Sequence, residues 1–220
     1  MEELFDLCDE RGRLLGISKV RSLVHRDGDW HRSFHCWVVD RLPDGDVAIL
    51  LQQRSADKDT CPGLWDVSVG GHYSAGEGLH GGLREIREEL GLSVELDQLV
   101  QAGWRHGVAY HENGLIDREV QDIFFLHHPI ELPKLNPDPI EVQGLAVVSG
   151  TSLLSLDSGK TERVNTAGAR VTLAGALEIG MQSLRSADLV PRESRYFERA
   201  VRFGQALVSS RRVGVRRRWW

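Results

Sequence analysis

Cysteine is scarce in this sequence, with three among 220 residues: Cys8, Cys36 and Cys61. The number is odd, and the spacings differ from those of paired metal-binding cysteines. These observations argue against a disulfide framework and against a cysteine-ligated zinc site. We therefore expect three reduced thiols, as in a cytoplasmic protein.

Long apolar segments are absent as well, since no run approaches the roughly 18 residues that indicate a membrane span. The first ten residues, MEELFDLCDE, are acidic, unlike a secretory signal or an arginine-rich transit peptide. Both features favour a cytoplasmic location and predict no membrane partner.

Positive charge is concentrated at the C-terminus. The last ten residues, RRVGVRRRWW, contain five arginines and no acid, so the net charge of −5 leaves −10 on residues 1–210. An acidic body does not favour nucleic acid as the main partner. The tail at 211–220 has two interpretations: a disordered end, or a segment that binds nucleic acid or an anionic membrane through arginine and tryptophan.

Hydrophobic patterning predicts strands at 34–39, 47–52, 99–104, 120–126 and 143–148, with a strand beginning in 65–69. A hairpin is expected over 4–17, with its turn at 10–12. Six glycines in 70–82 predict irregular backbone. Helices are expected at 83–90, 153–156 and 195–209, a long loop at 129–139, and no element is assigned over 157–175.

Strands mixed with a few helices predict an α/β or α+β sandwich. The expected organisation is an N-terminal hairpin extension at 1–30, one main domain at 31–210, and the basic tail.

Three carboxylates lie on the helix predicted at 83–90. Glu85, Glu88 and Glu89 have the spacing i, i+3, i+4, which places them on one face. Oxygen ligands in this arrangement suit Mg²⁺ or Mn²⁺. The glycine-rich segment before the helix would allow backbone N–H groups to approach a phosphate. The alternative is an ordinary surface helix with a solvated acidic face.

The segment GGHYSAGEGLHGGLREIREELGL at 70–92 resembles the box of the Nudix superfamily. Gly71, Glu77, Arg84-Glu85-Ile86, Glu88-Glu89 and Gly91-Leu92 fill its pattern. One feature departs from the pattern, because six residues rather than seven separate Glu77 from Arg84. The resemblance implies a Nudix-type α/β/α sandwich with a mixed sheet, an N-terminal β-hairpin and a C-terminal helix.

The resemblance extends to the Nudix branch that includes isopentenyl diphosphate isomerase, over most of residues 1–210. That enzyme uses a cysteine just before a Gly-His pair, and here Gly70 precedes Gly71-His72. Glycine has no side chain to act as acid or base. His31, His72, Asp117 and Glu119 match metal ligands of the isomerase, and His25 lies near the place of a further histidine ligand.

Together these features predict a metal-dependent hydrolase that cleaves a diphosphate linkage in a nucleoside diphosphate derivative or a related diphosphate. The alternatives are isopentenyl diphosphate isomerase and a non-catalytic nucleotide-binding module. The resemblance implies metal ligands Glu85, Glu88 and Glu89, catalytic Glu88, Glu119 and Arg84, and substrate-binding Gly70, Gly71 and His72. Mg²⁺ is the expected cofactor, with Mn²⁺ as the alternative.

The expected partner is a small diphosphate, and a homodimer is an expectation from the family. Four aromatic residues are candidates either for stacking on the substrate or for the core: Trp30, Trp37, Trp104 and Tyr110.

Overall fold

The computed structural model describes residues 2–111, 114–192 and 195–209. Its strands are β1 (Leu4–Cys8), β2 (Leu14–Val20), β3 (Trp30–Arg41), β4 (Val47–Arg54), β5 (Trp65–Asp66), β6 (Val69–His72), β7 (Leu99–Tyr110), β8 (Ile116–His127), β9 (Val142–Ser149), β10 (Arg163–Val171) and β11 (Leu177–Arg185). Its α-helices are α1 (Arg21–Asp27), α2 (His80–Leu90), α3 (Gly150–Asp157) and α4 (Tyr196–Ser209).

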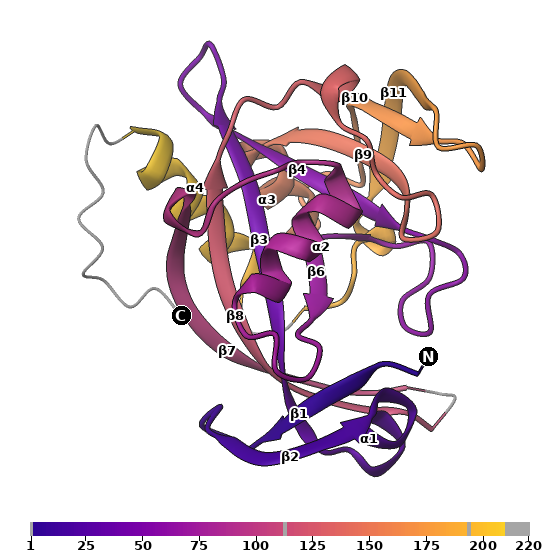
Figure 1. Cartoon of the computed structure of the whole chain (residues 1–220). Coiled ribbons are helices and arrows are strands. Elements are labelled where there is room, and N and C mark those ends of the chain that lie inside the picture. The colour runs from indigo at the N-terminus through magenta and orange to yellow at the C-terminus, as the bar shows by residue number, and fades with distance from the viewer. Residues whose placement is uncertain (1, 112–113, 193–194, 210–220) are drawn as a thin grey trace.

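The strands form a mixed sheet with the order β11-β10-β9-β4-β3-β1-β2. Strand β8 pairs in parallel with β3 and antiparallel with β7, which continues the sheet on another branch. Short strands β5 and β6 pair with β4 and β3. Figure 1 shows α2 on one side of this sheet, with α3 and α4 on the other.

Strand β3 explains the layers, because it is buried on both faces. Trp37 and Val39 pack in a cluster with the apolar side chains of α3 and α4. Phe34 and Val38, which point the opposite way, pack in a second cluster with Ile86 of α2. One strand therefore supplies two cores, and the predicted α/β/α sandwich with a mixed sheet is confirmed.

The expected N-terminal hairpin is present as β1 and β2, and Gly12 takes a φ of 76° at its turn. A single register position, Leu7 opposite His31, joins it to β3. Phe5, Leu7 and Val24 form a small core of their own. Helix α1, which supplies Val24, was not predicted, because seven residues are too few to establish helical periodicity.

The interpretation of 70–82 as irregular backbone is wrong at both ends. Gly70, Gly71 and His72 belong to β6 and pair with His35, Phe34 and Ser33 of β3. Helix α2 begins at His80, three residues before the predicted start. The glycines serve close packing here: a Cβ on Gly82 would lie 2.5 Å from the Phe34 ring.

The hairpin β10–β11 was also not predicted. Its residues alternate poorly because most of β11 is exposed, so the pattern of a half-buried strand is missing. The helix expected at 195–209 is confirmed as α4, and that expected at 153–156 lies within α3.

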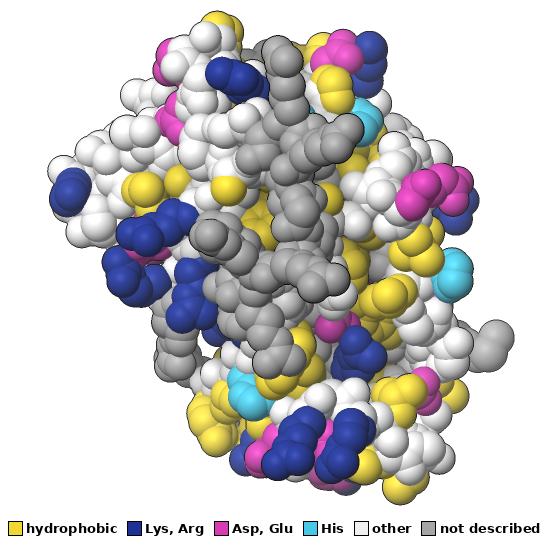
Figure 2. All heavy atoms as spheres, turned by 90° about the vertical axis from the view of Figure 1, so that its left-hand side faces the viewer, with side chains coloured by type: hydrophobic (Ala, Val, Ile, Leu, Met, Phe, Trp, Pro, Cys, Tyr) yellow, Lys and Arg dark blue, Asp and Glu magenta, His cyan; other side chains and the backbone are white. Residues whose placement is uncertain are grey.

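The surface shows charges of both signs. On the face drawn in Figure 2, Lys and Arg side chains lie in small groups with acidic and apolar side chains between them. Among the described residues, no helix has the length and apolar character to cross a membrane. The tail at 211–220 lies outside the described residues.

Candidate active site

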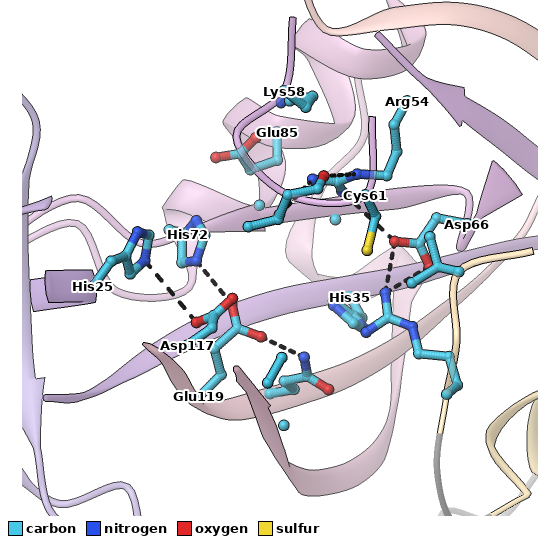
Figure 3. A pocket seen from close by; sticks show the side chains of 18 of the residues that line it. His25, His35, Arg54, Lys58, Cys61, Asp66, His72, Glu85, Asp117 and Glu119 are labelled. Carbon is cyan, nitrogen blue, oxygen red and sulfur yellow. Dashed lines mark hydrogen bonds and ion pairs between the residues drawn. The ribbon is translucent and has the colours of Figure 1, made fainter. Parts of the chain in front are cut away.

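A cavity opens where α2, β6 and the β7–β8 hairpin meet the segments 54–66 and 190–192. Charged and polar side chains dominate its lining, and Figure 3 shows them converging from these elements. The predicted site residues Gly70, Gly71, His72, Arg84, Glu85, Glu88 and Glu119 all line it. Glu89 lies just behind, bound to the backbone of Gly70.

The three carboxylates of α2 differ in exposure. Glu88 keeps 46% of its side chain exposed, whereas Glu85 and Glu89 are 8% and 1% exposed. The Gly70 backbone N–H and Gln52 Nε2 both donate to Glu89 Oε2 at 2.8 Å. This Gly70 N–H is therefore occupied by protein, although the sequence suggested that it would face a phosphate.

Arg84 links the acids of this segment. Its Nε and Nη2 donate to the two carboxylate oxygens of Glu77 at 2.8 and 3.0 Å. Its Nη1 lies 3.0 Å from Glu85 Oε1 and 2.9 Å from Glu88 Oε2. The shorter spacing between Glu77 and Arg84 does not prevent this bidentate pair. Arg84 thus fixes two of the candidate metal ligands and offsets their repulsion.

Gly71 is required by the position of Glu85. A Cβ at Gly71 would lie 2.1 Å from the carboxyl carbon of Glu85, so any side chain here would force the Glu85 carboxylate to move. At Gly70, the nearest atoms to such a Cβ are Val67 Cγ1 at 3.4 Å and His35 Cδ2 at 3.7 Å. Two adjacent glycines therefore have different roles, and only Gly71 is sterically obligatory.

The electrostatics of α2 suit a bound cation. Burial, assisted by the charge of Glu85, raises the pKa of the Glu89 carboxyl to about 8. Burial also raises the pKa of Glu85. Neighbouring buried carboxylates repel when both are ionised, and a divalent ion would relieve that repulsion. The donor set of carboxylate oxygens fits Mg²⁺ or Mn²⁺.

A second cluster with metal-ligand chemistry lies on the hairpin side of the cavity. One ligand atom each from His25, His31, His72 and Asp117 lies within 4.8 Å of the others. Within the described chain, His25 Nε2, His31 Nε2 and Asp117 Oδ1 are buried without a hydrogen-bond partner. Such orphaned groups are costly, and a metal ion with imidazole and carboxylate ligands would satisfy them.

The surroundings of His25 and His31 keep these two histidines of the second cluster neutral. Burial, together with His72, lowers the pKa of His25 to about 3 and that of His31 to about 4. Burial, and then Glu119, raises the pKa of Asp117 to about 7. Neutral imidazole is the form that binds metals.

Glu119 of β8 is a further acidic residue that contacts this cluster, through His72. His72 Nε2 lies 2.8 Å from Glu119 Oε1, and Gln121 donates to Glu119 Oε2. Burial disfavours the charged form of each residue, but their mutual attraction outweighs burial. Glu119 therefore raises the pKa of His72, and His72 lowers the pKa of Glu119. Glu119 therefore lies against the histidine cluster and lines the same cavity as Glu85 and Glu88.

Several cavity residues were not found from the sequence. Arg54, Cys61, Asp66, Arg105 and Arg192 line the cavity. The one sequence signal for this group was Asp66, an acid in the short apolar strand that begins at Trp65. Since buried charges are rarely unpaired, an acid at such a position indicates a basic partner nearby. None of the aromatic candidates lines the cavity in the described residues. Trp37 is a core residue, and Trp104 and Tyr110 are exposed.

Comparisons with known proteins agree with this geometry. A NUDIX domain family model matches residues 29–165. A Nudix hydrolase of Clostridium acetobutylicum is 34% identical over 202 residues, covering 91% of this chain and 96% of the relative. An isopentenyl-diphosphate Delta-isomerase of Streptomyces coelicolor is 33% identical over 152 residues, covering 68% of this chain and 73% of that enzyme.

Among solved structures, a protein of Deinococcus radiodurans is similar with a TM-score of 0.51 and 23% identity, covering 71% of this chain and 90% of that chain. This likeness concerns the fold. The family model and the relative that spans nearly the whole chain show that the protein belongs to the Nudix hydrolase family.

Proposed function

We propose that this protein hydrolyses a diphosphate linkage, in a nucleoside diphosphate derivative or a related diphosphate, with Mg²⁺ as its cofactor and Mn²⁺ as an alternative. The observation that carries this proposal is the set Glu85, Glu88 and Glu89 on one cavity-facing helix, with Arg84 bound to two of them.

The metal, when bound, would neutralise phosphate charge and lower the pKa of a coordinated water. Glu85, Glu88 and Glu89 would hold it. Glu89 is fixed through Oε2 by Gly70 and Gln52, so it is suited to a positional role. Glu88 is the most exposed of the three. In this proposal it accepts the proton that water loses when the water oxygen bonds to phosphorus and the bridging P–O bond breaks. Arg84 would act as a positioning residue.

Glu119 and His72 complete the proposed site. Glu119 is buried, is held by His72 and Gln121, and lines the cavity. Such a fixed carboxylate can hold a second ion or accept a proton from water. Gly71 would contribute to the site by giving the Glu85 carboxylate room to lie against β6.

The second candidate function is isomerisation of isopentenyl diphosphate. The cluster of His25, His31, His72 and Asp117 favours it, and so does the similarity to isopentenyl-diphosphate isomerases. Cys61 lines the cavity as a thiol whose pKa is raised by burial. Gly70, at the position expected for the cysteine, has no proton to give, and the intact carboxylate set on α2 favours hydrolysis.

The test is a substrate panel with Mg²⁺ and mass analysis of the products. The panel contains nucleoside triphosphates, nucleotide sugars, dinucleotides and isopentenyl diphosphate. Cleavage between two phosphorus atoms supports the proposal and identifies the substrate class. Isomerisation of isopentenyl diphosphate without any hydrolysis overturns it. A panel left unchanged, although the nucleotides bind, supports the non-catalytic module instead.

A further inference from the structure

The cavity extends beyond both carboxylates and histidines to a group of side chains that the proposed hydrolysis does not use. Figure 3 shows Asp66, Arg54 and His35 at the end opposite His25. Asp66 is buried, and Arg192 Nη2 donates to both of its carboxylate oxygens at 2.6 Å. Arg54 Nη1 lies 3.6 Å from the same carboxylate. Two guanidinium groups therefore share one negative charge.

The neighbours of this group do not remove the excess positive charge. Burial, aided by Arg192, lowers the pKa of His35 to about 3, so its imidazole is neutral. His35 Nδ1 lies 2.6 Å from the Tyr196 hydroxyl, whose pKa is raised by burial. Burial likewise keeps Cys61 as a neutral thiol. Among the groups in direct contact here, two arginines therefore face one carboxylate, and Glu119 acts on Arg192 only at longer range.

Arg192 is held in place but not fully satisfied. Its guanidinium lies over the Tyr196 ring, 5.3 Å from the centroid, and Arg105 approaches the same ring at 4.8 Å. Arg192 Nε is buried and has no hydrogen-bond partner within the described residues. A buried charged donor without an acceptor is costly, and an anion bound beside it would accept this hydrogen bond. Arginine is especially suited to phosphate oxygens.

The group formed by Arg54, Asp66 and Arg192 lies directly behind the carboxylates of α2. The Gly70 N–H donates to Glu89, while the Cβ direction of Gly70 faces His35 at 3.7 Å. His35 in turn contacts Tyr196, on which Arg192 rests. Only strand β6 and one layer of side chains separate the two groups, and both line one cavity. Histidines are the sole aromatic rings in the described lining, so it offers no large aromatic face to a base.

We propose that the Arg192 end of the cavity binds a further phosphate group of the substrate, beyond the diphosphate that is cleaved. The preferred substrates are accordingly compounds with three or more phosphates, rather than simple diphosphate esters. This inference rests on the proposed function for the place of the scissile diphosphate.

Binding of two phosphonates that resist hydrolysis tests this inference. Methylenediphosphonate and bis(methylene)triphosphonate are titrated calorimetrically, with Mg²⁺, into the wild-type protein and Arg192→Gln. Arg192→Lys preserves a charge partner for Asp66 if the glutamine variant does not fold. Arg202→Gln is the matched control, since it removes an arginine of α4 that is 66% exposed and distant from the cavity lining.

The wild-type protein is expected to prefer the triphosphonate at least about tenfold, the worth of one charge-assisted hydrogen bond. Arg192→Gln should reduce that preference to about threefold or less, and Arg192→Lys should reduce it by at least about threefold, since both lose the guanidinium and its unpaired Nε donor. Arg202→Gln should leave it unchanged.

An equal affinity of the wild-type protein for both phosphonates overturns the inference and leaves the proposed function standing. So does an undiminished preference in folded Arg192→Gln or, if that variant does not fold, in Arg192→Lys. Failure to bind either compound contradicts the diphosphate site itself, and the inference with it.

Discussion

The two candidate metal centres of this protein are built in different ways. The carboxylates Glu85, Glu88 and Glu89 come from a single helix, and the arginine that organises them, Arg84, precedes them directly. The histidine cluster takes one ligand from each of α1, β3, β6 and β8. The first centre is a local property of the chain, whereas the second exists only once the hairpin extension has docked on the sheet.

That difference predicts different sensitivities. Changes on α2 should alter chemistry without disturbing the fold, because Glu88 is half-exposed. Changes in the histidine cluster should alter the docking of the N-terminal hairpin, since Phe5 stacks on His31 and His72 with centroids 5.2 and 4.7 Å apart.

Glu88→Gln should lower kcat by a factor of at least roughly 10², as expected for weakened metal-ion catalysis, while the protein stays folded. Steady-state kinetics on the substrate found in the panel, with circular dichroism for folding, provide the measurement. Glu162→Gln, an exposed surface change, is the control and should have wild-type kinetics. A near-normal rate in Glu88→Gln would remove the α2 carboxylates from the mechanism.

Gly71→Ala and Gly70→Ala form a matched pair of adjacent substitutions. The new Cβ at 71 would lie 2.1 Å from the Glu85 carboxyl carbon, whereas that at 70 meets nothing closer than 3.4 Å. Gly71→Ala should therefore reduce kcat/KM by at least about tenfold through displacement of a metal ligand, and Gly70→Ala by about twofold or less. Equal effects of the two substitutions would contradict the steric role assigned to Gly71.

His31→Asn should remove one bound metal equivalent while hydrolysis falls by less than about tenfold, because the α2 centre remains intact. Metal content after dialysis against Mn²⁺, measured by elemental analysis, gives the stoichiometry, and kinetics give the rate. Loss of hydrolysis as complete as in Glu88→Gln would show that the two centres act as one.

The contribution of Glu89 to the stability of the metal-free protein should fall as pH rises. The Glu89 pKa is raised from 4.5 to about 8 by burial and by Glu85, so the folded state retains a proton that the unfolded state loses. The stabilisation is complete below pH 4.5 and disappears as pH rises through about 8. Below pH 6.5 the buried histidines His25, His31 and His35, whose pKa values are lowered, oppose this trend. Thermal melts in a chelator should therefore show Tm decreasing by a few degrees as pH rises from 6.5 to about 8.

Two changes sharpen the pH prediction. Glu89→Gln should flatten this dependence, because its amide does not titrate, and added Mg²⁺ should raise Tm most at high pH. A wild-type profile that matches Glu89→Gln throughout would mean that Glu89 ionises normally.

The local centre could be predicted from the sequence, and the assembled one only in part. The spacing of Glu85, Glu88 and Glu89 on a helix determines a shared face without tertiary information. The positions of His25 and Asp117 depend on α1 and on the register of β7 with β8. Hydrophobic periodicity in the sequence predicts neither of these features. Resemblance to a family indicated those residues, but periodicity did not.

The sandwich itself followed from apolar runs, yet β6, β10 and β11 did not. In β6, Gly71 leaves room for the Glu85 side chain and does not form a turn. A strand therefore has a glycine content that is typical of loops. In β10–β11, exposure removes the alternation on which strand prediction depends. Arg192 and Asp66 are 126 positions apart in sequence, and such a distant pair leaves no local signal.

The most direct test of the central claim is hydrolysis of the best substrate in ¹⁸O-labelled water with Mg²⁺, followed by mass analysis of the products. The account predicts one ¹⁸O atom in a phosphate product, formed at the full rate by the wild-type protein and at least about a hundredfold more slowly by Glu88→Gln. Product formation without incorporation of ¹⁸O, or labelling at an equal rate in the two proteins, would contradict attack by water activated at the α2 carboxylates.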